Sequence, residues 1–240
     1  MRGRETSPQG GWMSEAASSL ALAGFLGLVF VAFTLLALEP LAALDAYLNL
    51  SLPPRRWLPV LQLLDRIGQR AVCLPVLALA VWVCCRRRRS WRPALLAAGS
   101  VMTLNLLVLA LKVGLGRGQP APADPSFFVG GMAYPSGHTA NIVLVYGLAV
   151  FLLGRYVGLR RRTLIALWSA VGGLSVLMVV VSATLSWHWF ADLIAGLLVG
   201  AIVLELTVAA DAAVPGPASE AHSAQGAGAS GSWQSSHHGR

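Results

Sequence analysis

Three groups of polar residues in this 240-residue chain could do chemistry, and each lies beside a long apolar stretch. The first is Lys112, the second is the Pro-Ser-Gly-His run at 135–138, and the third is the pair His188 and Asp192. Ionisable residues at membrane depth are costly and tend to mark function. These three groups are therefore the first candidates for a functional site.

His188 and Asp192 are four residues apart, so on a helix they would share one face. The carboxylate could then accept a proton from one imidazole nitrogen, which fixes the tautomer and raises the basicity of the other nitrogen. A histidine held in this way can act as a nucleophile or as a base. A purely structural hydrogen bond has the same spacing, so both interpretations remain open at this point.

The Pro-Ser-Gly-His run is typical of the start of a helix, where backbone N–H groups are free and the helix dipole favours an anion. Ser136 could add a hydroxyl donor, Gly137 would permit close approach, and His138 could donate a proton to a leaving oxygen. The same residues would also make an ordinary helix cap.

Lys112 is the only lysine among 18 basic residues. A lysine at the edge of an apolar helix commonly extends its ammonium group to the interface. Its compact charge in a chain that otherwise uses arginine also suggests a contact with phosphate oxygens.

The composition predicts a membrane protein: 56% of the residues are hydrophobic and 12% are charged, against about 25% charged in average globular chains. This excludes a soluble domain, a disordered chain and a nucleic-acid-binding module, despite the net charge of +8. We expect an all-α polytopic membrane protein with six transmembrane helices in a bundle. The expected spans are 16–38, 71–85, 93–111, 136–154, 163–187 and 189–210. The second span is preceded by an amphipathic approach at 57–69, which carries Asp65 and Arg66 and is expected to be interfacial or partly buried.

The domain plan that follows is an N-terminal segment at 1–15, a membrane domain at 16–210 and a disordered tail at 211–240. The tail is rich in Ala, Gly, Ser and Pro and cannot bury enough apolar surface to offset its ordering entropy. Arginines gather before the first span and in the second and fourth connections, and short cytoplasmic loops are enriched in such residues. We therefore expect a cell-membrane protein with both termini cytoplasmic and all three polar groups at the outer face.

Cysteine and metal chemistry are not expected. The three cysteines form no disulfide framework, and no spacing typical of a metal site is present. No cofactor is predicted.

In type, order and spacing the three groups resemble the motifs of the type 2 phosphatidic acid phosphatase superfamily, the membrane lipid phosphate phosphatases related to vanadium haloperoxidases. The family pattern is Lys, six residues and Arg-Pro, then Pro-Ser-Gly-His, then Ser-Arg, five residues, His, three residues and Asp. The resemblance covers roughly residues 57–210. The matching residues are Lys112, Pro135, Ser136, Gly137, His138, His188 and Asp192.

The resemblance implies hydrolysis of a phosphate ester or diphosphate without a metal ion. His188, oriented by Asp192, would attack phosphorus to give a phosphohistidine, and His138 would protonate the leaving oxygen. Lys112, Ser136 and Gly137 would bind the phosphate oxygens. The implied partners are the bilayer and a lipid phosphate or polyprenyl diphosphate substrate, with the oligomeric state open.

The chain departs from the pattern at two positions where the family has a phosphate-binding arginine, because it carries Gln119 and Ser182 there. Each lost arginine removes a charge-assisted donor worth on the order of 1.5 to 3 kcal/mol. Our hypothesis is that Arg117 or Arg70 serves as a substitute phosphate clamp. The alternative is a non-hydrolytic lipid-phosphate binder or carrier that keeps the fold. A transporter is less favoured, since no inverted repeat is evident.

Overall fold

The computed structural model describes residues 8–48, 53–120 and 125–214, and all regular structure in these ranges is helical. The longer helices are α1 (Pro8–Leu38), α4 (Arg70–Arg88), α5 (Arg92–Leu115), α8 (Arg161–Thr184) and α9 (Phe190–Ala213). The shorter helices are α2 (Ala42–Leu48), α3 (Leu58–Asp65) and α6 (Gly137–Asn141), followed by α7 (Gly147–Leu152). A 3₁₀ turn, η1, covers Arg66–Gly68, and wider π turns cover Ile142–Tyr146 (η2) and Leu153–Val157 (η3).

Five helical segments in the described part of the chain are long and apolar enough to cross a membrane. A sixth is the bent pair Leu58–Gly68 and Arg70–Arg88, whose axes differ by 42°. The break falls at Gln69, which has an extended backbone. The six-span all-α prediction is therefore confirmed in the form of five continuous segments and one broken one, and the approach at 57–69 is its bent outer part.

Most predicted span ends lie three or four residues from the observed helix ends; the third span, for example, was expected to end at residue 111, whereas α5 continues to Leu115. The fifth span was expected to reach residue 187, but α8 ends at Thr184, ahead of Ser186, whose φ of 53° is left-handed. The sixth was expected to end at residue 210, whereas α9 continues to Ala213. Residues 215–240, which make up most of the predicted tail, and 1–7 of the predicted N-terminal segment lie outside the described residues.

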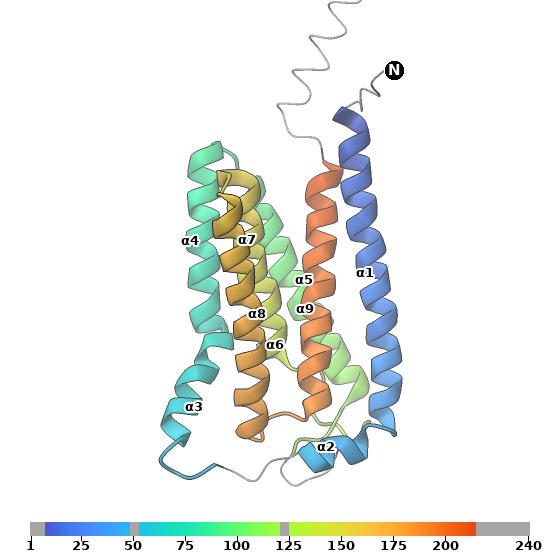
Figure 1. The fold of residues 1–240 in the computed structure, drawn as a ribbon. Coiled ribbons are helices and arrows are strands. Elements are labelled where there is room, and N and C mark those ends of the chain that lie inside the picture. Colours follow the sequence, from blue (N-terminus) through green and yellow to red (C-terminus); the bar gives the residue numbers. More distant parts are fainter. Residues whose placement is uncertain (1–7, 49–52, 121–124, 215–240) are drawn as a thin grey trace, which may run out of the picture.

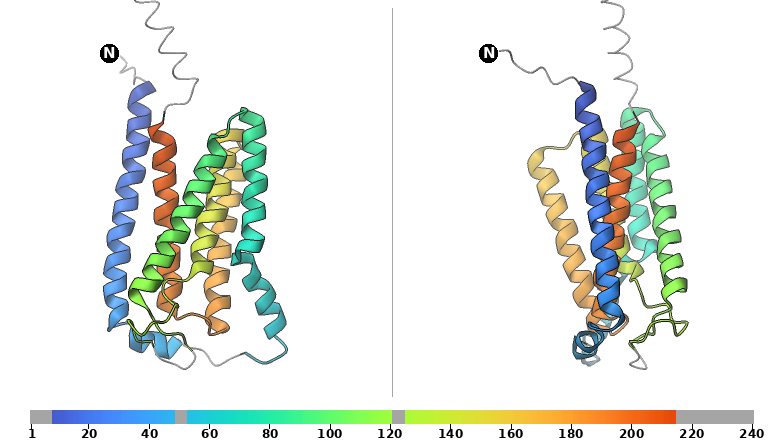
Figure 2. Two further views of the ribbon diagram at one scale, coloured as in Figure 1. Left: turned by 180° about the vertical axis from the view of Figure 1, so that it is seen from behind. Right: turned by 90° about the vertical axis from the view of Figure 1, so that its right-hand side faces the viewer.

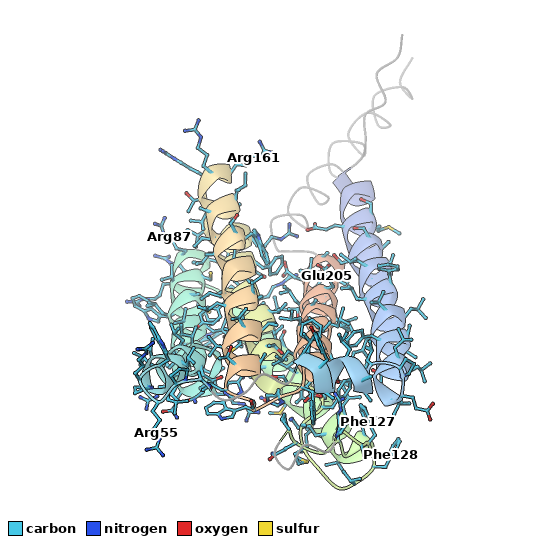
Figure 3. The ribbon with its side chains drawn as sticks, turned by 60° about the horizontal axis from the view of Figure 1, so that its bottom comes forward. Arg55, Arg87, Phe127, Phe128, Arg161 and Glu205 are labelled. Atoms are coloured by element: carbon cyan, nitrogen blue, oxygen red, sulfur yellow. The ribbon has the colours of Figure 1, made fainter. Side chains whose placement is uncertain are left out.

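The helices form an elongated bundle in which α1 packs along α9 (Figures 1 and 2). The start of α1 and the end of α9 lie at the same end of this bundle (Figure 1). Arg87 and Arg161 lie at that end, whereas Arg55, Phe127 and Phe128 lie at the opposite one (Figure 3). We call the end with Arg87 and Arg161 the arginine-rich end, and the end with Phe127 and Phe128 the loop end.

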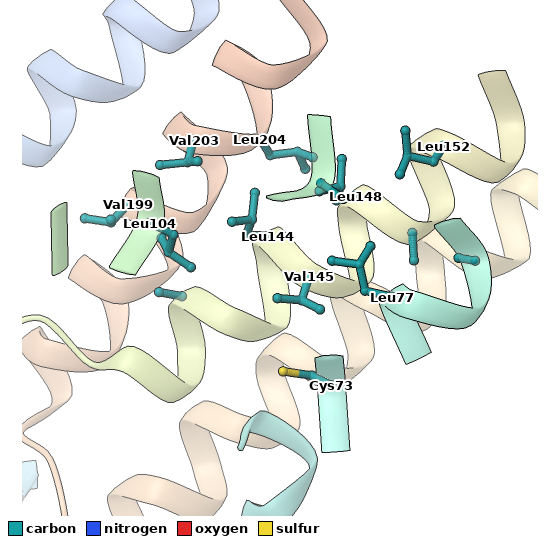
Figure 4. Close-up of a cluster of buried hydrophobic side chains, with 14 of the residues drawn as sticks. Cys73, Leu77, Leu104, Leu144, Val145, Leu148, Leu152, Val199, Val203 and Leu204 are labelled. Atoms are coloured by element: carbon teal, nitrogen blue, oxygen red, sulfur yellow. The ribbon is translucent and has the colours of Figure 1, made fainter. Parts of the chain in front are cut away.

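The buried core lies between α4, α5, the 137–157 segment and α9 (Figure 4). Gly196 and Gly200 on α9 permit its close contact with the start of that segment. A Cβ atom at Gly196 would overlap the Ser136 carbonyl, and one at Gly200 would lie 2.6 Å from the Ala140 oxygen. Small residues four apart let two helices approach closely in a membrane. This approach brings residues 136–140 against the first turns of α9.

A buried carboxylate ties the helices together at the arginine-rich end. Asp211 of α9 accepts hydrogen bonds from Arg92 Nε (2.9 Å), Arg155 Nε (3.1 Å) and the Tyr156 hydroxyl (2.6 Å). Its side chain is only 2% exposed. These contacts give a physical reason for α9 to continue beyond residue 210, since they draw Asp211 into the bundle rather than into the tail.

Candidate active site

A cavity of about 490 Å³ opens at the loop end of the bundle and brings together the three groups singled out from the sequence. The residues come from the end of α5, the following loop, the start of α6 and the α8–α9 connection. They are Lys112, Gln119, Met132, Gly137, His138, Ser186, Trp187 and His188.

His188 and Asp192 lie close together, but not on one helix face as expected. His188 precedes α9, Trp189 is its N-cap, and Asp192 is the third residue of the helix. Oδ2 of Asp192 accepts a hydrogen bond from the Trp189 N–H at 2.9 Å and lies 3.5 Å from His188 Nδ1. Among the described residues the buried Nδ1 has no hydrogen-bond partner. This arrangement leaves His188 Nε2 as the atom for chemistry.

Arg117 is fully buried beneath this pair and does not line the cavity. Its guanidinium lies 2.6 Å from Asp192 Oδ1 and 2.5 Å from Asp45 Oδ2. The guanidinium carbon is 4.7 Å from the centre of the Phe127 ring. The structure therefore places Arg117 between two carboxylates, with both terminal nitrogens engaged, rather than at the expected phosphate position.

Asp45 is a site residue that the sequence analysis missed. It lies on α2, is 1% exposed, and accepts a hydrogen bond from the Ala191 N–H at 2.9 Å. Asp45 and Asp192 therefore satisfy donors at the start of α9 while sharing Arg117. The only available signal was an isolated acidic residue in an apolar segment, which does not identify its distant partner.

Ser136 is the N-cap of α6, as the Pro-Ser-Gly-His run suggested, but its backbone N–H is not free. It donates to the Asp192 carbonyl at 2.9 Å and so joins α6 to α9. The Ser136 hydroxyl is buried and has no hydrogen-bond partner among the described residues. Ser136 itself is fully buried and is not among the residues that line the cavity, whereas Gly137 and His138 are.

His138 faces a second buried carboxylate, that of Asp65 at the end of α3. Its Nε2 lies 3.3 Å from Asp65 Oδ2, and Ser182 donates to Asp65 Oδ1 at 3.2 Å. Asp65 and Ser182 are both fully buried. Ser182 therefore contacts a carboxylate and does not line the cavity. From the sequence, Asp65 is only one charged residue of the approach at 57–69, and its contact with His138 was not predicted.

Lys112 lies in the last turn of α5, lines the cavity, and donates a hydrogen bond to the Met132 carbonyl. Gln119, at the first substituted arginine position, also lines the cavity with an uncharged amide. Arg70, the second candidate clamp, is exposed at the start of α4 and is not among the lining residues. Lys112 is thus the one lysine or arginine among the residues that line the cavity.

The loop that carries these groups is held by aromatic contacts. Tyr134 is buried, its hydroxyl is 2.6 Å from the Thr34 hydroxyl, and its ring packs edge-on against Phe127. Burial raises the pKa of Tyr134 to about 12, so this phenol stays neutral at physiological pH. The Trp189 indole donates to the Gly118 carbonyl at 2.9 Å. These contacts attach the 116–136 loop to α1 and α9.

The three motifs of the site fall within a segment that matches a known protein family. The model described as the PAP2 superfamily matches residues 93–213, which is half of the chain and includes all three motifs. The chain belongs to the PAP2 superfamily. The resemblance predicted from the motifs is therefore confirmed. No curated protein sequence matches the chain.

The fold of this PAP2 protein is similar to that of a membrane phosphatidylglycerolphosphate phosphatase of the PAP2 type from Bacillus subtilis. The TM-score is 0.70 at 20% sequence identity, and the alignment covers 80% of this chain and 97% of the other. Asp45, Asp65 and Arg70 lie before the segment that the PAP2 family model matches. The contacts that Asp45 makes with Arg117 and Asp65 makes with His138 therefore come from the part of the chain before that segment.

Proposed function

We propose that this PAP2 protein is a membrane phosphatase that hydrolyses a phosphate ester or diphosphate carried on a lipid. Membership of the superfamily supports a phosphatase-type hydrolase. The observation that carries the proposal is the shared cavity, because His138, His188 and Lys112 all line it. Nucleophile, proton donor and phosphate-binding cation are thus within reach of one substrate phosphate.

In the first step, His188 Nε2 attacks phosphorus, and the bond between phosphorus and the leaving oxygen breaks. His138 gives its proton to that oxygen, which leaves as the lipid alcohol or, from a diphosphate, as the lipid monophosphate. Asp192 stabilises the imidazole ring of His188 as it gains charge. The product is a phosphohistidine.

In the second step, water attacks phosphorus, the P–N bond breaks, and His138 takes a proton from the water. Inorganic phosphate leaves, and both histidines return to their starting states. Lys112, the Ser136 hydroxyl and the Gly137 backbone would stabilise charge on the equatorial oxygens. Arg70 would contribute only if its exposed side chain turns toward the cavity.

The site would act at the extracytoplasmic face. It lies at the loop end, opposite the end at which α1 begins and α9 ends. That opposite end carries the arginine-rich connections, which favour the cytoplasmic side. A lipid phosphate is the natural substrate because the cavity opens at this end of a bundle with an apolar exterior. Phosphatidate, phosphatidylglycerol phosphate and a polyprenyl diphosphate define the substrate panel.

The test is phosphate release from this panel by the purified protein in detergent or nanodiscs. We expect turnover of at least one lipid, loss of turnover in His188→Ala, and retention in Thr184→Ala, whose hydroxyl donates to the Val180 carbonyl within α8. Acid-labile labelling of the protein by substrate carrying ³²P should also disappear in His188→Ala. Equal inactivity of wild type and His188→Ala on every lipid would reject the enzyme.

The alternative, a non-hydrolytic binder of lipid phosphates, is favoured by one observation. Gln119 lines the cavity where the motif has an arginine, and Ser182 contacts Asp65 instead of the cavity. A binder would retain lipid phosphate in a vesicle-binding assay without releasing phosphate. Binding that is unaffected by His188→Ala, without any turnover, would favour this alternative.

A further inference from the structure

The two histidines of the cavity each face a buried carboxylate, but the two carboxylates differ in how their charge is balanced. Asp192 shares the guanidinium of Arg117 at 2.6 Å. Asp65 has no lysine or arginine within ion-pairing distance among the described residues. Its partners are Ser182, which is neutral, and His138.

An uncompensated carboxylate in a buried position strongly favours a positive partner. Oδ2 of Asp65 has no hydrogen-bond partner in the described part of the chain, and His138 Nε2 is 3.3 Å away. Protonation of the His138 ring would supply both the missing donor and the missing charge. The two histidines therefore differ in their surroundings: Arg117 balances the charge of the carboxylate beside His188, whereas within the described ranges only His138 could balance that of Asp65.

Asp65 is held in this place by contacts on the residues that follow it. The Tyr146 hydroxyl donates to the Ile67 carbonyl at 3.0 Å, and the Asn141 side chain donates to the Gly68 carbonyl at 3.2 Å. Gly68 lies so close to α6 that a Cβ atom there would be 3.1 Å from Cβ of His138. The turn after α3 is thus fixed directly against the helix that carries His138.

Four charged or titratable groups face His138 from the elements packed around it. Burial is the largest influence and opposes a charge on the His138 ring; His188, Lys112 and Arg70 oppose it as well, and Asp65 favours it. The groups that oppose protonation outnumber the one that favours it. Asp65 is therefore the group on which a protonated His138 depends.

We propose that Asp65 is a positioning residue that holds His138 protonated and oriented as the proton donor to the leaving oxygen. The contact uses Nε2, so the proton given to the substrate is on Nδ1. In this arrangement Asp192 lies beside the neutral nucleophile, His188, and Asp65 lies beside the charged acid, His138. Different surroundings allow two groups of the same type to act as nucleophile and as acid in one site. This inference rests on the proposed phosphatase function.

The test compares wild type, Asp65→Asn and Ser182→Ala, with an alkyl phosphate lipid and p-nitrophenyl phosphate as substrates. Ser182→Ala is the matched control, because it removes the other hydrogen bond of Asp65 and keeps the carboxylate. For the lipid, Asp65→Asn should lower kcat about 10²-fold with KM little changed. It should also move the high-pH limb of the rate profile about one pH unit lower. Ser182→Ala should leave the limb in place.

p-Nitrophenolate leaves without a proton, so its release should depend much less on Asp65. A loss of kcat in Asp65→Asn that is equal for both substrates, with an unchanged pH profile, would mean a structural role only and would overturn the inference. That result leaves the proposed function intact, because wild type would still turn over and His188→Ala would not.

A second measurement does not need turnover. ¹⁵N-histidine NMR of the protein in nanodiscs should show His138 losing its proton at lower pH in Asp65→Asn than in wild type. The same titration of His138 in both proteins would overturn the inference even if the enzyme is active. Thermal unfolding of the variants checks that each is folded.

Discussion

Nη1 of Arg117 lies 2.6 Å from Oδ1 of Asp192, and the other oxygen of that carboxylate faces His188. Arg117, at the loop end of the bundle, thus acts on His188 through the carboxylate of Asp192. The guanidinium does not reach the cavity because Arg117 is buried. The same guanidinium holds Asp45, so one cation connects α2, the 116–136 loop and α9.

Replacement of Arg117 should destabilise the protein. Arg117→Met leaves two buried carboxylates without a cation, and breaking a buried ion pair costs about 3–5 kcal/mol. Thermal or denaturant unfolding in detergent would measure the loss. The clamp hypothesis predicts something different, namely a normally stable Arg117→Met protein with a raised KM for the lipid phosphate.

Asp45→Asn and Asp192→Asn form a matched pair. Each removes one carboxylate from Arg117 and one charged acceptor from the first turn of α9, so similar losses of unfolding free energy are expected. Only Asp192 faces His188, so only Asp192→Asn should also reduce kcat, by about 10²–10⁴-fold at a temperature where both variants are folded. Equal kcat values for the two variants would contradict the assigned role of Asp192.

Lys112→Met should weaken phosphate binding. Lys112 is the basic residue that lines the cavity, and a charged hydrogen bond is worth about 1.5–3 kcal/mol, or about 10- to 100-fold in affinity. Competitive inhibition by inorganic phosphate would measure this change. Arg70→Gln should have a smaller effect because Arg70 is exposed and outside the cavity lining. An effect of Arg70→Gln as large as that of Lys112→Met would identify Arg70 as the substitute clamp.

Asp211→Asn should lower stability without changing the chemistry. The carboxylate is bound by two arginines and a tyrosine at the end of the bundle away from the cavity. We expect a loss of about 1.5–3 kcal/mol in unfolding free energy, because the two arginines left behind are partly exposed, and an unchanged kcat per folded molecule. Glu205→Gln, which removes the same charge from the same helix, is the control and should shift the unfolding transition little.

A cysteine at Val129, which is 52% exposed at the loop end, tests the orientation in the membrane. An impermeant thiol reagent should label it in intact cells and should label a cysteine at Arg160 only after lysis. Cys73 and Cys84 are buried, so Cys85 is the native cysteine to replace first. The reverse labelling pattern would invert the proposed topology.

The motif residues were predictable because their signals are local. Apolar runs, arginine-rich connections and the order Lys112, His138, His188 are all read along the chain, and the structure and the family comparison confirm the membrane fold and the superfamily. The end of α9 was not predictable in this way. It depends on Asp211 meeting Arg92, which lies 119 residues earlier.

The hydrophobic pattern of the sequence predicts the six spans, and the resemblance of its motifs predicts the PAP2 superfamily and places the polar groups at one end. How charge is divided at that end depends on the tertiary structure. Asp45 meets the start of α9 across 146 residues, and Asp65 meets Ser182 across 117 residues. Such pairs leave no periodicity or spacing in the sequence, because a buried charge needs only some partner in space. Packing alone assigns Arg117 to two carboxylates and leaves Asp65 to His138.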